Sequence, residues 1–277
     1  MKFTKMHGLG NDFIIMEAPS WEEGGHYQAY ASSLCNRNFG VGADGLIITG
    51  PDPELDIFMR IFNPDGSEPE MCGNGIRCVA RYAYDYNLVK TNQIGVRTLA
   101  GPRYPELIIK DQQVEAVRVD MGEPELKREN IPVKGENSNI GLRLQVNSQE
   151  FIATAVSMGN PHCIIFVDEV DKIPISTWGS LLEVHEMFPA RINVEFVQVL
   201  NNEEIVMRVW ERGTGLTLAC GTGACASLVA SALNDKTGRR ATVHLPGGDL
   251  LIEWSESDNH VYMTGPAVEV FEGVISK

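Results

Sequence analysis

The sequence predicts an α/β (α+β) protein made of two similar, strand-rich halves. Three observations support this class: segments of the two halves recur at one spacing, most of the remaining pattern is typical of short strands, and each half has one helical segment that follows a cysteine-glycine turn. Recurrence at a fixed spacing indicates repeated structural units. We therefore expect two pseudo-symmetric domains that arose by internal duplication.

The cysteine-glycine turns form the clearest repeat. Arg60-Ile61-Phe62 precedes Cys72-Gly73-Asn74-Gly75 by the same gap that separates Arg208-Val209-Trp210 from Cys220-Gly221-Thr222-Gly223, at an offset of 148 residues (72 to 220). Each half therefore carries one cysteine in front of a glycine turn.

Two further windows repeat in the same order. Leu9-Gly10-Asn11 recurs as Met158-Gly159-Asn160, and Asp44 aligns with Asn193, both at an offset of 149 (11 to 160 and 44 to 193). Chance recurrence among glycine-rich turns could explain any one window. Three windows in one order favour duplication.

Short apolar segments separated by turns predict the strands. In the first half they are Lys2–His7, Asp12–Glu17, Gly45–Ile48, Asp56–Phe62, Glu106–Lys110 and Glu115–Asp120. In the second half they are Phe151–Ser157, His162–Asp168, Glu195–Val199, Ile205–Glu211, Ala241–His244, Asp249–Trp254 and His260–Met263. Pro246-Gly247-Gly248 predicts a hairpin turn.

Two segments have apolar residues at helical spacing directly after the cysteine-glycine turns. They are Gly75–Asn87 and Thr222–Asn234. Amphipathic patterns at Tyr27–Leu34 and Ser176–Met187 predict peripheral helices. Each half is therefore expected to wrap its strands around one helix, or to pack them on it.

Glycine and proline at Met121–Pro124 predict a domain boundary. We expect a first domain over residues 1–118 and a second over 119–266. The closing segment 267–277, with a strand at Ala267–Ile275, is expected to complete the first domain. Asn130–Gly141 is predicted to be a polar loop.

Composition limits the functions that the chain can have. A formal net charge of −14 disfavours nucleic acid, whose phosphates are bound by lysine and arginine, and there is no polybasic segment for anionic lipid. The first seven residues lack the apolar region of a secretory signal, and no segment has the roughly 20 apolar residues of a membrane-spanning helix. Six cysteines in 277 residues do not suggest a disulfide scaffold. We expect a cytoplasmic protein with reduced thiols.

The cysteine-glycine turns place each sulfur at a helix N-terminus. Unpaired backbone N–H groups and the helix dipole make such a position an anion site. A carboxylate can bind the N–H groups of Gly73-Asn74-Gly75 and of Gly221-Thr222-Gly223. The same environment is expected to lower the pKa of each thiol from about 8.5 toward neutrality.

One thiolate and one thiol on opposite sides of a carbon could invert its configuration. Removal of the α-proton of an amino acid builds negative charge on its carboxylate, and two helix N-termini would stabilise that charge. Cys72 and Cys220 are therefore the predicted acid–base residues. The remaining cysteines are interpreted as small buried hydrophobic residues: Cys35, Cys78, Cys163 and Cys225.

Two other uses of the cysteines compete with acid–base chemistry. Zinc is disfavoured because Cys72-x5-Cys78 and Cys220-x4-Cys225 miss the usual ligand spacing, so no metal is expected. A disulfide between Cys72 and Cys220 could form under oxidation and would inactivate the site.

With these residues identified, the chain resembles the diaminopimelate epimerase family, the pyridoxal-independent enzymes of the meso-diaminopimelate and lysine pathway. The matching segments span nearly the whole chain in the family's order. They are His7–Phe13, Gly42–Gly45, Arg60–Asn63, Asp65–Glu68, Cys72–Gly75, Arg77-Cys78, Met158–His162, Asn193–Phe196, Val209–Gly213 and Ala219–Ala224.

The resemblance implies two domains, each a β-barrel-like sheet around a central helix, with the active site in the cleft between them. It implies an epimerase that interconverts LL- and meso-diaminopimelate without a cofactor, for lysine and peptidoglycan precursors. It also implies substrate-binding roles for residues that match the family: Asn11, Asn63, Asn160, Asn193, Glu211 and Arg212. The expected partner is the small-molecule substrate, and the chain could form a homodimer.

Chemistry agrees with these roles, because Arg212 can bind a carboxylate through two hydrogen bonds and Glu211 can accept from an ammonium group. Gly73, Asn74, Gly221 and Thr222 are included as substrate-binding residues of the two turns. His162 matches a family histidine beside the site, and we assign it a supporting polar role. Taken singly, these residues could be turn residues or a solvated charge pair.

Two positions depart from the family's pattern. Gly45 stands where some members have a glutamine near the substrate, and Leu216 where many have a glutamate. One hydrogen bond to the reacting end could therefore be missing or supplied by water. No lysine stands in a recognisable Schiff-base context, which fits cofactor independence.

Two other functions compete with epimerisation of diaminopimelate. Racemases of proline or hydroxyproline typically carry histidine where this chain has Asn74, and a ring substrate would not need Arg212 with four asparagines. A non-catalytic amino-acid-binding relative should lack at least one of the two cysteines, and this chain has both.

Overall fold

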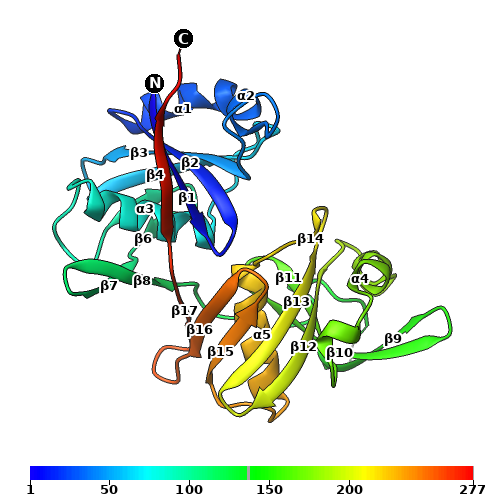
Figure 1. Cartoon of the computed structure of the whole chain (residues 1–277). Helices are drawn as coiled ribbons and strands as arrows, with labels where there is room; N and C mark the ends of the chain where they lie inside the picture. Colours follow the sequence, from blue (N-terminus) through cyan, green and yellow to red (C-terminus); the bar gives the residue numbers. More distant parts are fainter. Residues whose placement is uncertain (136–137, 277) are drawn as a thin grey trace. The chain divides into compact units, whose positions relative to one another are not determined.

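The computed structural model of the chain describes residues 1–135 and 138–276 (Figure 1). Residues 136 and 137 of the predicted loop, and residue 277 of the predicted closing segment, lie outside this range. The chain divides into two compact units. Unit 1 comprises residues 1–120 and 264–277, and unit 2 comprises residues 121–263.

Unit 1 contains a mixed sheet in the order β18-β1-β2-β3-β4-β5-β6. Its strands are β1 (Lys2–Gly8), β2 (Asn11–Glu17), β3 (Gly45–Pro51), β4 (Ile57–Phe62), β5 (Val96–Thr98), β6 (Gly101–Arg103) and β18 (Val268–Val274). A hairpin of β7 (Glu106–Lys110) and β8 (Gln113–Asp120) completes the strands of this unit. Helix α3 (Gly73–Asp85) packs against β1 to β4 and against the hairpin, so the strands surround it.

Three short helices connect β2 to β3 in unit 1. They are α1 (Trp21–Gly25), the 3-10 helix η1 (His26–Tyr30) and α2 (Ala31–Cys35). The predicted helix at Tyr27–Leu34 is therefore broken into a 3-10 and an α-helical part. Apolar side chains from these helices and from β2 to β4 form a buried cluster that includes Cys35.

Unit 2 contains a mixed sheet in the order β17-β16-β15-β13-β12-β11-β10-β9, with β14 paired to β13. Its strands are β9 (Ile140–Val146), β10 (Gln149–Ser157), β11 (Pro161–Phe166), β12 (Asn193–Asn201), β13 (Glu204–Glu211), β14 (Gly215–Leu216), β15 (Arg240–Leu245), β16 (Gly248–Trp254) and β17 (Val261–Gly265). Helix α5 (Gly221–Leu233) packs against β10 to β13, β15 and β16.

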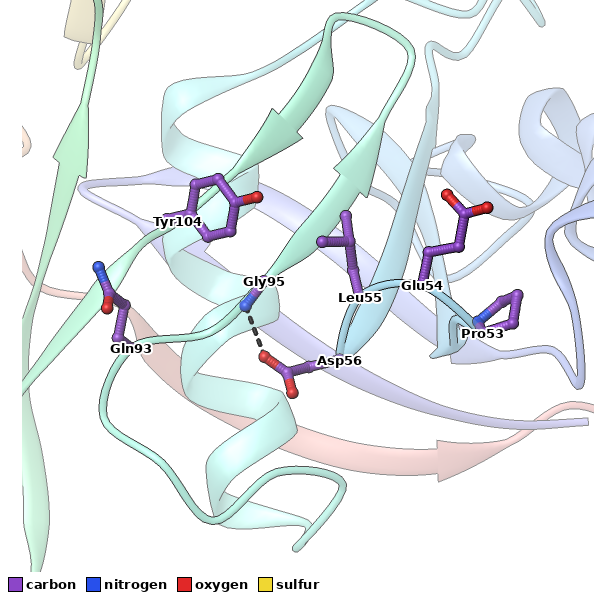
Figure 2. A pocket seen from close by; sticks show the side chains of 7 residues that line it. All are labelled: Pro53, Glu54, Leu55, Asp56, Gln93, Gly95 and Tyr104. Atoms are coloured by element: carbon purple, nitrogen blue, oxygen red, sulfur yellow. Dashed lines mark hydrogen bonds between the residues drawn. The ribbon is translucent and has the colours of Figure 1, made fainter.

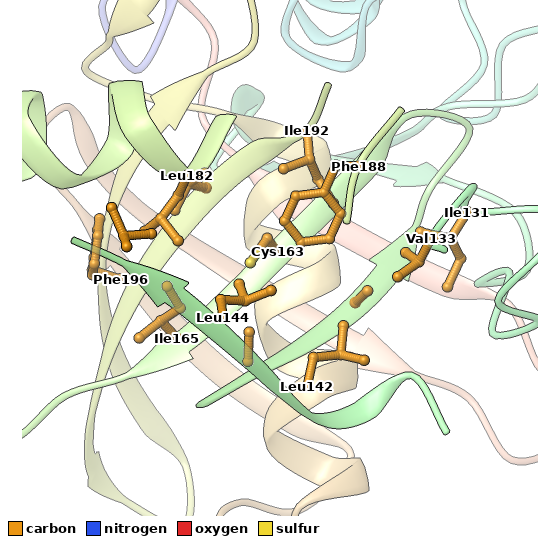
Figure 3. Packing of buried hydrophobic residues seen from close by; sticks show 14 of the residues in the cluster. Ile131, Val133, Leu142, Leu144, Cys163, Ile165, Leu182, Phe188, Ile192 and Phe196 are labelled. Carbon is orange, nitrogen blue, oxygen red and sulfur yellow. The ribbon is translucent and has the colours of Figure 1, made fainter. Parts of the chain in front are cut away.

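The helices η2 (Val170–Lys172) and α4 (Ile175–Glu183) connect β11 to β12. Figure 3 shows the apolar cluster that this connection covers, in which Cys163 lies among Leu144, Leu182 and Phe196. Because these side chains are nearly inaccessible to water, their burial stabilises the sheet against α4.

The two units have the same strand pairing. Along β18-β1-β2-β3-β4-β5-β6 and along β9-β10-β11-β12-β13-β15-β16, the pairs are antiparallel, antiparallel, parallel, antiparallel, parallel and antiparallel. Leu46 pairs with Phe62 and Val194 pairs with Trp210, so this register repeats at the offset seen in the sequence.

The two central helices repeat as well. Both α3 and α5 have 13 residues, and each is followed by a residue of positive φ, Asn87 and Asp235. The predicted class, two strand-rich halves with a sheet around one helix in each, is confirmed. Strands β5, β6, β9 and β14 were not predicted. Among the described residues, no helix combines the length and apolarity that a membrane crossing requires.

Candidate active site

Each of the two cysteine-glycine turns caps a helix with its sulfur. Cys72 is the N-cap of α3, and its Sγ accepts a hydrogen bond from the N–H of Gly75 at 3.4 Å. Cys220 is the N-cap of α5, and its Sγ accepts from the N–H of Gly223 at 3.3 Å. Both cysteines have extended backbone angles, as N-cap residues do. The remaining N–H groups of the first turn point away from the helix body, where an anion can bind them.

The turn of α3 lies against amide side chains. Asn74 Nδ2 donates to Asn11 Oδ1 at 3.1 Å, which links the helix to the start of β2. Gly8 of β1 permits this close approach, since a Cβ there would lie 2.8 Å from Arg77 Nη2 and 3.3 Å from the Asn74 carbonyl oxygen. Asn63 lies in a separate turn after β4, where its Nδ2 donates to Ser67 Oγ at 2.9 Å.

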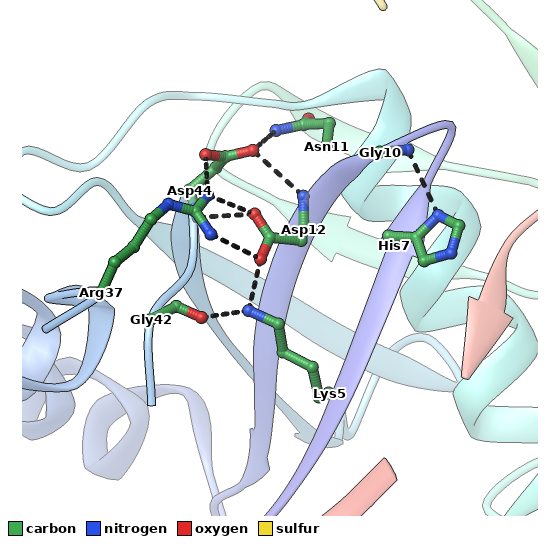
Figure 4. A network of polar contacts seen from close by, with 8 residues as sticks. All are labelled: Lys5, His7, Gly10, Asn11, Asp12, Arg37, Gly42 and Asp44. Carbon is green, nitrogen blue, oxygen red and sulfur yellow. Dashed lines mark hydrogen bonds and ion pairs between the residues drawn. The ribbon is translucent and has the colours of Figure 1, made fainter. Parts of the chain in front are cut away.

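Charged groups hold Asn11 from the other side, as Figure 4 shows. Asp44 Oδ2 accepts from Asn11 Nδ2 at 2.8 Å and from the N–H of Asp12 at 3.1 Å. Arg37 Nη2 donates to Asp12 Oδ1 and to Asp44 Oδ1, both at 2.7 Å. Burial raises the pKa of Asp12, but hydrogen bonds from Arg37 and Lys5 outweigh it and lower this pKa to about 2.

The turn of α5 lies against carboxylates instead. Glu195 on β12 is fully buried, and its Oε1 is 2.7 Å from His162 Nδ1 on β11. His162 Nε2 is 3.0 Å from Asn160 Oδ1. A Cβ at Gly223 would lie 2.8 Å from Glu195 Oε1, so this carboxylate packs directly against the first turn of α5.

Glu211 lies at the end of β13 and contacts the same cysteine. Its Oε1 accepts from Thr217 Oγ1 at 2.5 Å, and it is hydrogen-bonded to Cys220. Burial raises the pKa of Glu211, and the charge of Glu195 raises it further. Thr222 Oγ1 is 3.6 Å from Cys220 Sγ.

The expected lowering of the thiol pKa is wrong for Cys220. Burial raises the pKa of this thiol well above its usual value, and the charges of Glu211 and Glu195 raise it further. Hydrogen bonds from Thr222 and from the N–H of Gly223 act in the opposite direction but do not outweigh these causes. Burial and the two neighbouring carboxylates therefore favour the protonated form of the Cys220 thiol.

Asn193 and Arg212 form a second polar group in unit 2. Asn193 is the first residue of β12, and its Nδ2 donates to the carbonyl oxygen of Pro161 at 2.8 Å. Its Oδ1 accepts from the backbone N–H of Arg212 at 2.8 Å. The Arg212 side chain is exposed and donates to the carbonyl oxygen of Ala190 at 3.0 Å. Unit 2 thus brings together the predicted residues Asn160, His162, Asn193, Glu211, Arg212 and Cys220.

The other four cysteines are buried. Cys35, Cys78 and Cys163 are buried, and burial raises the pKa of Cys35 to about 11 and that of Cys78 to about 12. The pKa of the Cys163 thiol is shifted in the same direction for the same reason. Cys225 is also buried, on α5. These four cysteines are therefore buried, as expected of small hydrophobic residues.

The two departures from the family's pattern have clear local surroundings. A Cβ at Gly45 would lie 3.3 Å from both Phe13 Cδ1 and the carbonyl oxygen of Phe62, so a side chain fits there only if its neighbours shift. Leu216 lies on the short strand β14, where it pairs with Trp210 of β13, and 58% of its surface is exposed.

Sequence reasoning missed Glu195, Asp44 and Arg37. Glu195 lies in the segment Asn193–Phe196 that matches the family, but in the sequence it has the pattern of an ordinary polar strand residue. Its burial beside His162 depends on the pairing of β11 with β12. Asp44 could have been found, because the repeat aligns it with Asn193.

A hollow elsewhere in unit 1 and the arrangement of possible metal ligands also bear on where the chain could bind a ligand. A hollow of about 400 Å³ in unit 1 is lined by Pro53, Glu54, Leu55, Asp56, Gln93, Gly95 and Tyr104 (Figure 2), and none of these is a predicted site residue. In the part of the chain that the structure describes, no group of three or more His, Cys, Asp or Glu side chains is arranged to hold a metal ion.

Known proteins resemble this chain over its whole length. A diaminopimelate epimerase from Moorella thermoacetica is 56% identical over 274 residues, which cover 99% of this chain and 98% of the relative. A crystal structure of a PhzF-family phenazine biosynthesis protein from Bacillus anthracis matches with a TM-score of 0.71 and 18% identity over 99% of both chains. A probable proline racemase from Agrobacterium radiobacter K84 matches with a TM-score of 0.71 and 15% identity, over 99% of this chain and 92% of the other.

The two solved structures support the fold alone, because their sequences are so different. The sequence model of one family, by contrast, matches residues 3–127 and 154–270, which include both cysteine-glycine turns and every predicted site residue. Together with the identity to the Moorella enzyme, this match shows that the chain belongs to the diaminopimelate epimerase family.

Proposed function

We propose that this chain interconverts LL- and meso-diaminopimelate by moving a proton between Cys72, the α-carbon and Cys220. Membership in the diaminopimelate epimerase family supports the reaction. The observation that carries the mechanism is that both cysteines cap a helix in the same way. Each sulfur accepts a hydrogen bond from the backbone N–H three residues later, at the start of α3 or α5.

The acid and the base are assigned from their surroundings. Cys220, with a raised pKa beside Glu211 and Glu195, begins as the thiol. In the direction of reaction that starts with Cys220 as the thiol, the Cys72 thiolate takes the α-proton. The bonding electrons move into the carboxylate to give an enediolate. Cys220 then delivers its proton to the opposite face of the carbon and becomes the thiolate. The products are the inverted amino acid, a Cys72 thiol and a Cys220 thiolate, so the reverse reaction starts from that state.

The helix N-termini stabilise the enediolate. Backbone N–H groups of Gly73, Asn74, Gly221 and Thr222 bind the substrate carboxylate, where negative charge increases during proton removal. These dipoles are fixed before the reaction because they belong to two packed helices. They stabilise the transition state more than the ground state, which is the condition for catalysis.

The other family-matched residues bind the amino-acid groups. Glu211 accepts from an ammonium group, and Arg212 binds a carboxylate. The amides of Asn11, Asn63, Asn160 and Asn193 complete the hydrogen bonds to the two ends of the substrate. His162 supports the site by holding Glu195 and Asn160, with which it already interacts.

We propose that the two units correspond to the two expected domains, 1–118 with 267–277 and 119–266, whose bounds differ from those of the units by two or three residues. A reducing cytoplasmic compartment is proposed because both thiols must remain reduced for proton transfer.

A homodimer is proposed through strand β18. This strand is the edge of the unit 1 sheet, and Val270, Phe271 and Val274 on it are 54%, 46% and 72% exposed. An apolar edge strand is a pairing site for a second copy. Val270→Lys with Val274→Lys should give a monomer in light scattering, whereas Val184→Lys, at an exposed valine of unit 2, should not change the mass. A dimer that survives the paired change would contradict this assembly.

The experiment that tests the reaction follows the stereochemistry of LL-diaminopimelate incubated with purified protein in D₂O. Chiral separation should show meso-diaminopimelate with one deuterium at the inverted carbon. Cys72→Ala and Cys220→Ala should abolish inversion, while Cys35→Ala, in the core of unit 1, should retain it. Inversion of proline but not of diaminopimelate would overturn the proposal, and inversion by either active-site variant would overturn the two-thiol mechanism.

A further inference from the structure

The amide chain beside Cys72 has a defined direction. Asp44 is a carboxylate, which when ionised can only accept hydrogen bonds, so the atom of Asn11 that faces it must be Nδ2. Asn11 then presents Oδ1 to Asn74, and the atom of Asn74 that faces Asn11 must be Nδ2. The orientation of both amides therefore follows from one charged group.

The far end of this chain is an oxygen that has no hydrogen-bond partner. Asn74 is 6% exposed, and its Oδ1 is buried with no partner among the described residues. A buried acceptor without a partner destabilises the folded protein. Such a group is retained where a ligand supplies the missing donor, and Asn74 lies in the first turn of α3, two residues after Cys72.

We propose that Asp44 is a positioning residue, which does not touch the substrate but fixes Asn74 as a hydrogen-bond acceptor for the ammonium group of the reacting amino acid. This inference rests on the proposed function and assigns the ammonium at the end where the proton moves. Backbone N–H groups of the same turn bind the carboxylate. The first turn of α3 then distinguishes the two substituents of one α-carbon, because it offers only donors to one and an acceptor to the other.

Arg37 supports this arrangement without determining its direction. It donates to Asp44 and to Asp12, and both it and Asp44 are partly exposed, at 59% and 42% of their side chains. Its removal leaves a carboxylate that still accepts from Asn11. The direction of the chain thus depends on the charge type at position 44.

A paired substitution tests the direction. In Asp44→Asn, the new amide can donate to Asn11, which allows both asparagines to turn over and presents Asn74 Nδ2 to the substrate. In Asn74→Asp, Asn11 lies between two carboxylates and must turn its oxygen toward one of them. In the double variant, the new carboxylate at position 74 accepts from Asn11, and Asn11 accepts from the new amide at position 44. The second oxygen of that carboxylate then faces the ammonium as an acceptor again.

We expect each single variant to lose about 10- to 100-fold in kcat/KM, mainly through KM, and the double variant to recover at least 10-fold over either single one. Arg37→Gln should lose less kcat/KM than Asp44→Asn. Adding Asn74→Asp to Arg37→Gln should not restore the kcat/KM that Arg37→Gln loses. Asp85→Asn, the same chemical change at the other end of α3, is the matched control and should leave kcat/KM unchanged.

The urea midpoint of the four variants of the cycle gives a readout without substrate. The double variant should be more stable than the two single losses would predict, because the chain of hydrogen bonds is restored in the reverse direction. Losses that simply add, in kcat/KM and in midpoint, would overturn the positioning role. If the wild-type protein does not epimerise diaminopimelate, the proposed function fails, and the midpoint alone then decides whether the chain is directional.

Discussion

Alanine in place of the second glycine of each turn should affect the two units very differently. Gly75 and Gly223 occupy the same position in α3 and α5, and each donates its N–H to the capping sulfur. A Cβ at Gly75 would meet Ile47 Cδ1 at 3.0 Å and Met59 Cε at 3.2 Å, which are the ends of flexible side chains. A Cβ at Gly223 would meet Glu195 Oε1 at 2.8 Å and Cys220 Sγ at 3.1 Å.

The expected magnitudes follow from these contacts. Replacing a helical glycine by alanine stabilises by about 0.5–1 kcal/mol. Overpacking costs about 1–3 kcal/mol. At Gly75 the two effects should nearly cancel, since Met59 and Ile47 can move. At Gly223 the clash is with a buried carboxylate that His162 holds at 2.7 Å, so disturbing it adds the loss of a charged hydrogen bond, about 1.5–3 kcal/mol.

We expect Gly75→Ala to change the free energy of unfolding by less than about 1 kcal/mol and Gly223→Ala to lower it by about 2–4 kcal/mol. Urea denaturation followed by circular dichroism measures both. Gly223→Ala should also reduce kcat at least tenfold, because the added methyl group displaces the sulfur of Cys220. The reasoning would be refuted if Gly75→Ala were the more destabilising change, or if Gly223→Ala were neutral.

Three further predictions concern charged groups. Because the pKa of Asp12 in the folded protein is about 2, its stabilising effect should be present above about pH 4 and lost as the pH falls toward 2; a urea midpoint gap between wild type and Asp12→Asn that stays constant from pH 5 to 2 would contradict this. Glu211→Gln should lower the raised pKa of Cys220 and speed its alkylation by iodoacetamide about 3- to 10-fold at pH 7.5, as read by mass spectrometry, whereas a slower reaction would exclude the charge effect. Arg60→Met should lower the free energy of unfolding by about 2–3 kcal/mol, because Arg60 binds Glu68 at 2.7 and 2.8 Å and both side chains are mostly buried. The double variant Arg60→Met with Glu68→Leu should regain part of this free energy in urea denaturation. No recovery would argue against an unpaired Glu68 as the cause of the loss.

The central features of the fold could be predicted because their signals are local. A cysteine before Gly-x-Gly and then an apolar helical pattern determines where α3 and α5 begin, within two residues. The hairpin between β15 and β16 follows from Pro246-Gly247-Gly248. Strands β5 and β6 have only three residues each, which is too short for an alternating pattern to be recognised.

The electrostatics of the site could not be predicted in the same way. The two turns have nearly the same sequence, and the expected pKa effect was therefore assigned equally to both cysteines. The carboxylates that raise the pKa of Cys220 come from β12 and β13, and only strand pairing brings Glu195 and Glu211 to the helix. A local motif determines which backbone groups surround a sulfur, but not which charges are placed there by distant strands.

The discontinuity of unit 1 has a consequence for synthesis on the ribosome. Its sheet needs β18, which pairs with β1, and the amino group of Met1 donates to the carbonyl oxygen of Ile275 at 2.7 Å. Residues 121–263 emerge before β18 does, so unit 2 can complete its own sheet while β1 still has an open edge. The part of the chain that is translated first is therefore the part whose folding finishes last, and during that interval nascent β1 is available to chaperones and to other strands.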